Sequence, residues 1–119
     1  MNIEQFLSDY LAAALWSSCG DDGEPLDEEY GADDIAPDTL ARMRADCADF
    51  VASNTADLAE YAERSPAGSA GHDFWLTRSG HGAGFWDRGL GDLGRRLSDA
   101  AKVPGGVDLY IGDDGKVHA

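Results

Sequence analysis

Basic residues are scarce in this chain. Its 119 residues include 9 lysines and arginines against 23 aspartates and glutamates, which gives a formal net charge of −14. Because like charges oppose approach, this balance disfavours nucleic acid and anionic membranes as direct partners. It favours basic proteins instead, including proteins that themselves bind nucleic acid.

Cysteines and long apolar runs are also scarce. Cys19 and Cys47 are the 2 cysteines, and they form no CxxC motif, so we expect a reduced cytoplasmic protein and not a disulfide-built secreted one. The longest apolar run, Leu11 to Trp16, is far too short to cross a membrane. The opening residues MNIEQFLSDY carry early acids and no basic stretch, so we expect no secretory signal there.

Length and charge distribution predict one domain, 1–119, with two unlike parts. A hydrophobic content of 43% is near the norm for globular proteins. Residues 1–68 carry 16 acids and 3 bases, whereas residues 69–119 carry 7 acids and 6 bases. We therefore expect an acidic helical part, 1–68, followed by a part, 69–119, with a glycine-rich stretch, a helix and a hairpin.

Apolar spacing predicts three helices, at about residues 3–18, 37–64 and 88–102. Asn2 is a suitable cap for the first helix, Pro37 suits the first turn of the second, and Asp87 can cap the third.

Three short strands are expected at residues 74–77, 107–111 and 116–118, and GDDG joins the last two as a hairpin. The predicted fold class is α+β, with two N-terminal helices and a third packed on a three-stranded antiparallel sheet.

Acidic residues gather in two places. From Asp21 to Asp38 there are nine acids and no bases, interrupted by glycine and proline, so this is a loop, pinned to the core by Leu26, Tyr30 and Ile35. More acids lie opposite the apolar face of the second helix. The candidate partner-binding residues are Asp21, Asp22, Glu24, Asp27, Glu28, Glu29, Asp33, Asp34, Asp46, Asp49, Asp57 and Glu60.

The stretch GHDFWLTRSGHGAGFWDRG, residues 71–89, has two interpretations. In the first it is scaffold, in which Phe74 or Trp75, Phe85 and Trp86 fill a core and the glycines permit tight turns and close packing. In the second it is a small-molecule pocket, for which the candidates are His72, Asp73, Arg78, His81 and Asp87. We favour the scaffold interpretation.

Motifs for metal or nucleotide chemistry are not found. The stretch GHGAG lacks the serine of a GxSxG nucleophile elbow and the Lys-Ser/Thr of a phosphate-binding loop, and there is no HExxH or Cys/His cluster. We expect no metal, no cofactor and no catalytic residue.

The stretch GHDFWLTRSGHGAGFWDRGLG resembles a family of small acidic proteins from bacteriophages and related mobile elements. The resemblance extends backward through EPLDEEYGADDIAPDTLARMRADCADF and forward to DLYIGDDGKVH, so it covers most of the chain. It implies a location in the cytoplasm of a host cell but no defined activity. By analogy, mobile-element proteins of this size and acidity often act against host defence or host nucleic-acid machinery, some by mimicking DNA.

Two functions from different classes follow. The leading hypothesis is a binding module whose ordered acidic surface engages a basic, nucleic-acid-binding host protein and inhibits it as a DNA mimic would. The alternative is a small enzyme or ligand-binding domain with its pocket in residues 71–89. A third interpretation is that the acidity serves solubility alone.

Overall fold

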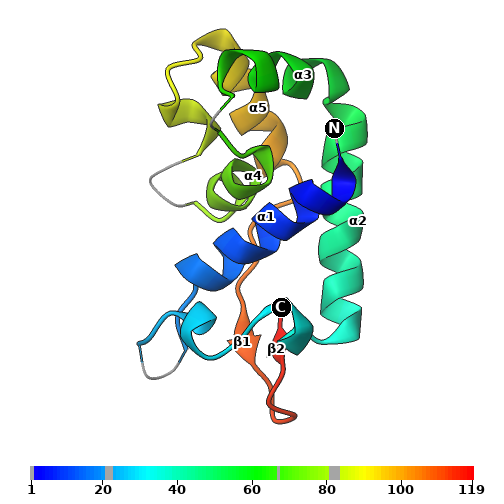
Figure 1. Cartoon of the computed structure of the whole chain (residues 1–119), viewed down its shortest axis with the longest axis vertical. Coiled ribbons are helices and arrows are strands. Elements are labelled where there is room, and N and C mark those ends of the chain that lie inside the picture. Colours follow the sequence, from blue (N-terminus) through cyan, green and yellow to red (C-terminus); the bar gives the residue numbers. More distant parts are fainter. Residues whose placement is uncertain (1, 21–22, 67, 81–83) are drawn as a thin grey trace.

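The computed structural model describes residues 2–20, 23–66, 68–80 and 84–119. These residues form five α-helices, three 3₁₀ helices and one two-stranded sheet (Figure 1). The α-helices are α1 (Ile3–Ser17), α2 (Pro37–Ser53), α3 (Thr55–Arg64), α4 (Ala70–Arg78) and α5 (Asp92–Lys102). The 3₁₀ helices are η1 (Leu26–Glu28), η2 (Ala32–Asp34) and η3 (Phe85–Asp87), and the strands are β1 (Tyr110–Ile111) and β2 (Val117–His118).

The predicted first helix is confirmed, since α1 begins after Asn2 and ends within one residue of the expected position. The Asn2 side chain accepts hydrogen bonds from the backbone N–H groups of Glu4 and Gln5, which satisfies two donors that the first turn leaves free. One face of α1 packs on α4, and Phe6 and Tyr10 lie buried at that contact.

The second predicted helix is two helices. The chain turns at Asn54, where α3 leaves the upper end of α2 and runs across the top of the molecule in Figure 1. The Asn54 side chain donates to the carbonyl of Phe50 at 2.8 Å, in place of a backbone N–H of a continuing helix. The turn brings Leu58 and Tyr61 over the core, where both are buried.

The predicted strand at residues 74–77 is wrong, because these residues belong to α4. The Ser69 hydroxyl caps this helix by accepting from the backbone N–H of His72 at 3.2 Å. Gly71 lets α4 approach α1, since a Cβ at this position would collide with the carbonyl oxygen of Phe6. Phe74 and Trp75 have high strand propensity, but burial on both sides decides their conformation here.

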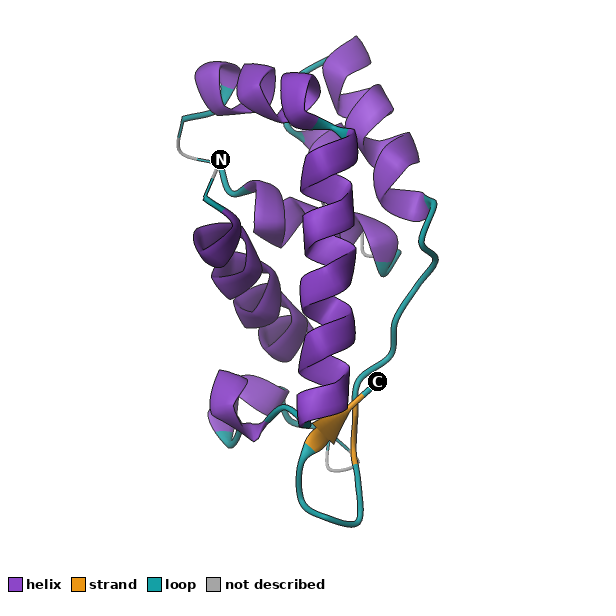
Figure 2. Cartoon of the chain, turned by 90° about the vertical axis from the view of Figure 1, so that its right-hand side faces the viewer, coloured by secondary structure: helices purple, strands orange, loops and turns teal. Residues whose placement is uncertain are grey.

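The predicted α+β fold with a three-stranded sheet is therefore wrong as well. The described residues are mostly helical, and their sheet has two strands, 110–111 and 117–118, which form the expected hairpin but are shorter than the strands predicted at 107–111 and 116–118. That hairpin pairs Tyr110 with His118 and Ile111 with Val117, and its turn places Gly115 at φ +76°. Figure 2 shows this small sheet at the end of the molecule opposite α3.

The third predicted helix begins later than expected. Asp87 does not cap it; α5 starts at Asp92, after Gly91 at φ +60°. Trp86 is 56% exposed, so the expectation that it fills a core is wrong, whereas Phe85 is fully buried. Gly94 admits a close neighbour, as expected of the glycines, because a Cβ there would lie 2.8 Å from the carbonyl oxygen of Phe85.

Candidate interaction surface

The acidic segment, residues 24–38, is folded onto the body of the protein. Leu26 and Ile35 are 3% and 4% exposed, as the sequence predicts, and Tyr30 packs against the same core. Two backbone hydrogen bonds hold the ends of the segment, one from Leu26 N–H to the Ser18 carbonyl and one from Ala36 N–H to the Val117 carbonyl. The carboxylates of this segment are thus presented on short, anchored turns.

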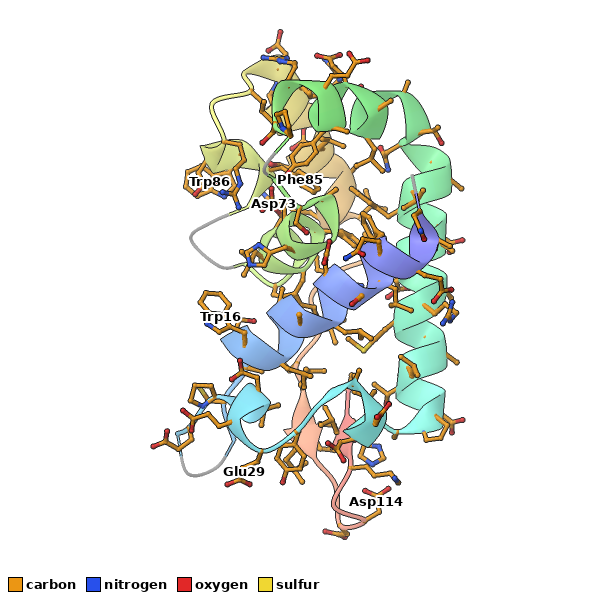
Figure 3. The ribbon with its side chains drawn as sticks, viewed as in Figure 1. Trp16, Glu29, Asp73, Phe85, Trp86 and Asp114 are labelled. Atoms are coloured by element: carbon orange, nitrogen blue, oxygen red, sulfur yellow. The ribbon has the colours of Figure 1, made fainter. Side chains whose placement is uncertain are left out.

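The acidic side chains of this segment face solvent. All seven belong to exposed residues, namely Glu24, Asp27, Glu28, Glu29, Asp33, Asp34 and Asp38. Asp34 caps its own turn by accepting from the Gly31 N–H at 2.8 Å. Asp27, Glu28, Glu29 and Asp33 form no ion pair with a described residue. Figure 3 shows Glu29 at the outer edge of the lower left of the molecule. Asp21 and Asp22, which the sequence assigned to the same surface, lie outside the described residues.

Most of the candidate acids on α2 and α3 form ion pairs, since three of the four have cationic partners. The Asp57 carboxylate accepts hydrogen bonds from Arg96 Nε at 3.2 Å and Arg96 Nη2 at 3.1 Å, and Glu60 pairs with Arg64 at 2.9 Å.

The third of these pairs joins Asp46 to the buried guanidinium of Arg78 at 2.8 Å. Asp49 is exposed and has no ion pair among the described residues. Among the described candidates, we therefore restrict the acidic surface to residues 24–38. Asp49 lies on α2 and is separate from it.

Arg78 sits at a junction of four parts of the chain. Its guanidinium donates to Asp46 on α2, to the Tyr10 hydroxyl on α1 and to the carbonyl of Gly105. It also lies over the Phe74 ring, 5.4 Å from its centroid. Desolvation lowers the pKa of Arg78, but the Asp46 carboxylate and Tyr10 outweigh it and the net shift is upward, so the side chain stays charged.

Asp73 forms a second buried polar cluster. This carboxylate is fully buried and accepts three hydrogen bonds, from Tyr61 Oη at 2.7 Å and from Arg88 Nε and Nη2 at 3.0 and 2.6 Å. Burial and the neighbouring Asp73 carboxylate raise the pKa of Tyr61. These contacts hold α3, α4 and the chain after η3 together, and Figure 3 shows Asp73 inside the upper part of the molecule.

The four candidate pocket residues that the structure describes do not all gather around one point. Asp73 is occupied by Arg88 and Tyr61, while Arg78 points to α1 and α2. Asp87 accepts from the Gly84 N–H at 3.1 Å. His72 lies 3.6 Å from Asp73 and its ring packs on the exposed Trp16. His81 lies outside the described residues.

The described residues offer neither a metal site nor a membrane-spanning helix. Within the described ranges there is no group of three or more histidine, cysteine or acidic side chains placed to hold a metal ion. Over the same part of the chain, no helix combines the length and the apolar character that crossing a bilayer requires.

Comparison with known proteins gives no match to a family model, a curated protein or a solved structure. No family is assigned. The resemblance to small acidic phage proteins therefore stays a prediction.

Sequence reasoning missed two features of the site. It placed Arg78 in the candidate pocket, but the structure uses this side chain to join Asp46 to the segment after α5. It also missed a groove between that segment and α2. The position of Arg78 directly after the residues FWLT was a signal for the first feature, since an arginine that is drawn into a core with such neighbours needs a charged or polar partner there.

Proposed function

We propose that this chain is a small acidic interaction protein that binds a basic surface of another protein, one that itself binds nucleic acid. The contact is made by the acidic segment, residues 24–38. The observation that carries the proposal is the set of seven exposed acidic residues in 15 consecutive residues without a lysine or arginine, on turns fixed by buried side chains.

Anchoring is what separates this surface from an acidic tail. Ordering a flexible segment on binding costs free energy, and a segment already fixed by Leu26 and Ile35 avoids most of that cost. Fixed carboxylates also present a steady negative field, which accelerates encounter with a basic partner. The DNA-like character lies in this dense negative charge, and inhibition would follow from occupying a nucleic-acid groove.

Solubility alone accounts less well for the arrangement. Asp57 and Glu60 have arginine partners, whereas Asp27, Glu28 and Glu29 have none among the described residues. Solubility requires net charge spread over a surface and does not require it to gather on one anchored segment.

The test uses four substitutions in the acidic segment and a matched set elsewhere. The test variant carries Asp27→Asn, Glu28→Gln, Glu29→Gln and Asp33→Asn. The control variant removes the same charge from exposed acids in the second part of the chain, through Asp92→Asn, Asp99→Asn, Asp108→Asn and Asp113→Asn.

Binding is measured by displacement of a fluorescent DNA duplex from a panel of basic DNA-binding proteins, with poly-L-arginine as a second probe. We expect the wild type and the control variant to displace the duplex, and the test variant to be weaker by at least about tenfold, mainly through the association rate. Equal loss in both variants would reduce the effect to net charge and refute the proposal. So would failure of the wild type to displace DNA from any member of the panel.

A further inference from the structure

A groove runs between α2 and the chain that follows α5. Figure 2 shows this chain passing alongside α2 on its way to the hairpin. Arg78 joins the two, because its guanidinium donates to Asp46 on α2 and to the carbonyl of Gly105 at 2.9 Å. The groove is therefore a fixed part of the fold and does not depend on a mobile loop.

Two cavities lie along this groove and share Asp46. The larger, about 320 Å³, includes Phe50 and Ser53 of α2 together with Ala100, Val103 and Pro104. The smaller, about 200 Å³, lies toward the start of α2 and reaches Val107. The larger volume is at the lower end of the range for small-molecule or side-chain binding sites.

The larger cavity has a mixed lining: its apolar walls are Phe50, Ala100, Val103 and Pro104, and its polar rim is Asp46, Asp49, Ser53 and Asn54. Val103 is 83% exposed, the highest value among the exposed large hydrophobic residues, although it ends a helix whose inner face is buried. Asp46 and Asp49 line the cavity from α2, and no lysine or arginine lines it. Asp49 makes no ion pair with a described residue, so its charge is available to an incoming cation.

We propose that this groove binds a short peptide segment of a partner protein in which an apolar side chain lies next to a lysine or arginine. The apolar side chain enters the cavity between Phe50 and Val103. The cation lies against Asp49 at the rim, with Asp46 held in place beneath it by Arg78.

Charge decides between the possible occupants. A second copy of this chain would bring a net charge of −14 against a face rimmed with carboxylates. A neutral apolar peptide would leave the exposed Asp49 charge without a partner. A segment that is both basic and apolar packs its apolar side chain against the walls and pairs its cation with the carboxylates at the rim. This site is separate from the acidic segment, so it stands or falls independently of the proposed function above.

The probe is a peptide with carboxyfluorescein on its N-terminus, carboxyfluorescein-Gly-Lys-Leu-Leu-Arg-Gly-amide, with two matched peptides in which the leucines become serine or the basic residues become glutamine. Binding is followed by fluorescence anisotropy, and the site is located by ¹H–¹⁵N chemical-shift changes. We expect saturable binding of the first peptide, loss of binding for both matched peptides, and shifts centred on Asp49, Phe50 and Val103.

Two protein variants test the walls and the rim. Val103→Ser and Asp49→Lys are both at exposed positions, so folding should be unaffected. Each should weaken peptide binding by about tenfold. The controls are Trp86→Ser, which removes another exposed apolar side chain, and Asp99→Lys, which makes the same charge change on α5; both should leave the affinity within about twofold.

Several outcomes would overturn the proposal. These are equal weakening by Asp49→Lys and Asp99→Lys, shifts confined to residues 24–38, and unchanged binding of the leucine-to-serine peptide. A dimer in sedimentation velocity that Val103→Ser abolishes would show that the occupant is a second copy. The variant with four neutral side chains in the acidic segment should still bind the peptide at the groove, which separates failure of this proposal from failure of the proposed function.

Discussion

Replacing Arg88 with methionine should destabilise the protein more than any other exposed-charge substitution in it. Asp73 is fully buried, and two of its three hydrogen bonds come from Arg88. Removing one partner of a buried ion pair costs about 3–5 kcal/mol, because the other charge is left without compensation. The Arg88 side chain is 35% exposed, so water can reach part of the cluster and we expect the lower end, about 3 kcal/mol.

The measurements are urea unfolding and thermal unfolding, both followed by far-ultraviolet circular dichroism, which suits a mostly helical chain. At about 4 °C per kcal/mol for a domain of this size, the melting temperature should fall by about 12 °C. The matched control is Arg95→Met, whose pair with Asp92 is exposed on both sides and should be worth less than about 0.5 kcal/mol.

A second variant tests the cause of the effect. Adding Asp73→Asn to Arg88→Met removes the unpaired charge, so the double variant should be more stable than Arg88→Met alone. A cost of less than about 1 kcal/mol for Arg88→Met would show that the buried Asp73 charge does not need Arg88. If Asp73→Asn destabilised the Arg88→Met variant as much as it destabilises the wild type, the unpaired charge would not be the cause of the Arg88→Met effect.

Four further outcomes are expected. Trp75→Ala should cost about 3–5 kcal/mol in urea unfolding because Trp75 is 1% exposed, whereas Trp86→Ala should stay within about 0.5 kcal/mol; equal costs would contradict the burial of these rings. Burial raises the pKa of Cys47 to about 12, so an aromatic disulfide reagent at pH 8 should titrate only Cys19 in the native protein and both thiols in denaturant. The folded Cys47 keeps its proton where the unfolded thiol loses it, so unfolding free energy should fall as pH rises from about 9 toward 12. Gly71→Val should lower the melting temperature strongly, since a Cβ there meets the backbone of α1; an unchanged value would refute the close contact.

Local signals in the sequence predicted the elements whose structure is decided locally. The cap at Asn2 and the apolar spacing after it predicted α1, and GDDG predicted the hairpin. The strand predicted at residues 74–77 failed because strand propensity reflects packing on a sheet, and here Phe74 and Trp75 pack between helices.

The same distinction between local and long-range signals applies to the candidate surface. The exposed acids of residues 24–38 could be predicted, because they stand in a segment without bases and next to anchoring apolar residues. The pairing of Asp46 with Arg78 and of Asp57 with Arg96 could not, since the partners are 32 and 39 residues apart. Only the tertiary fold, in which Arg78 at the end of α4 meets α2 and α5 packs on α3, brings those charges together.

The contact between Ile35 and β2 has a consequence for the order of events during synthesis. Ile35 forms a parallel bridge with Val117, and the Ala36 N–H donates to the Val117 carbonyl at 2.8 Å. One edge of the acidic segment is therefore fixed by residues that leave the ribosome 80 or so positions later. Until Val117 is made, these carboxylates lie on a part of the nascent chain whose edge is not yet fixed. A basic protein that bound this part of the chain then would have to order a flexible segment, and the entropic cost of that ordering would lower its affinity. The binding surface is therefore complete only after Val117 has been synthesised and has paired with Ile35.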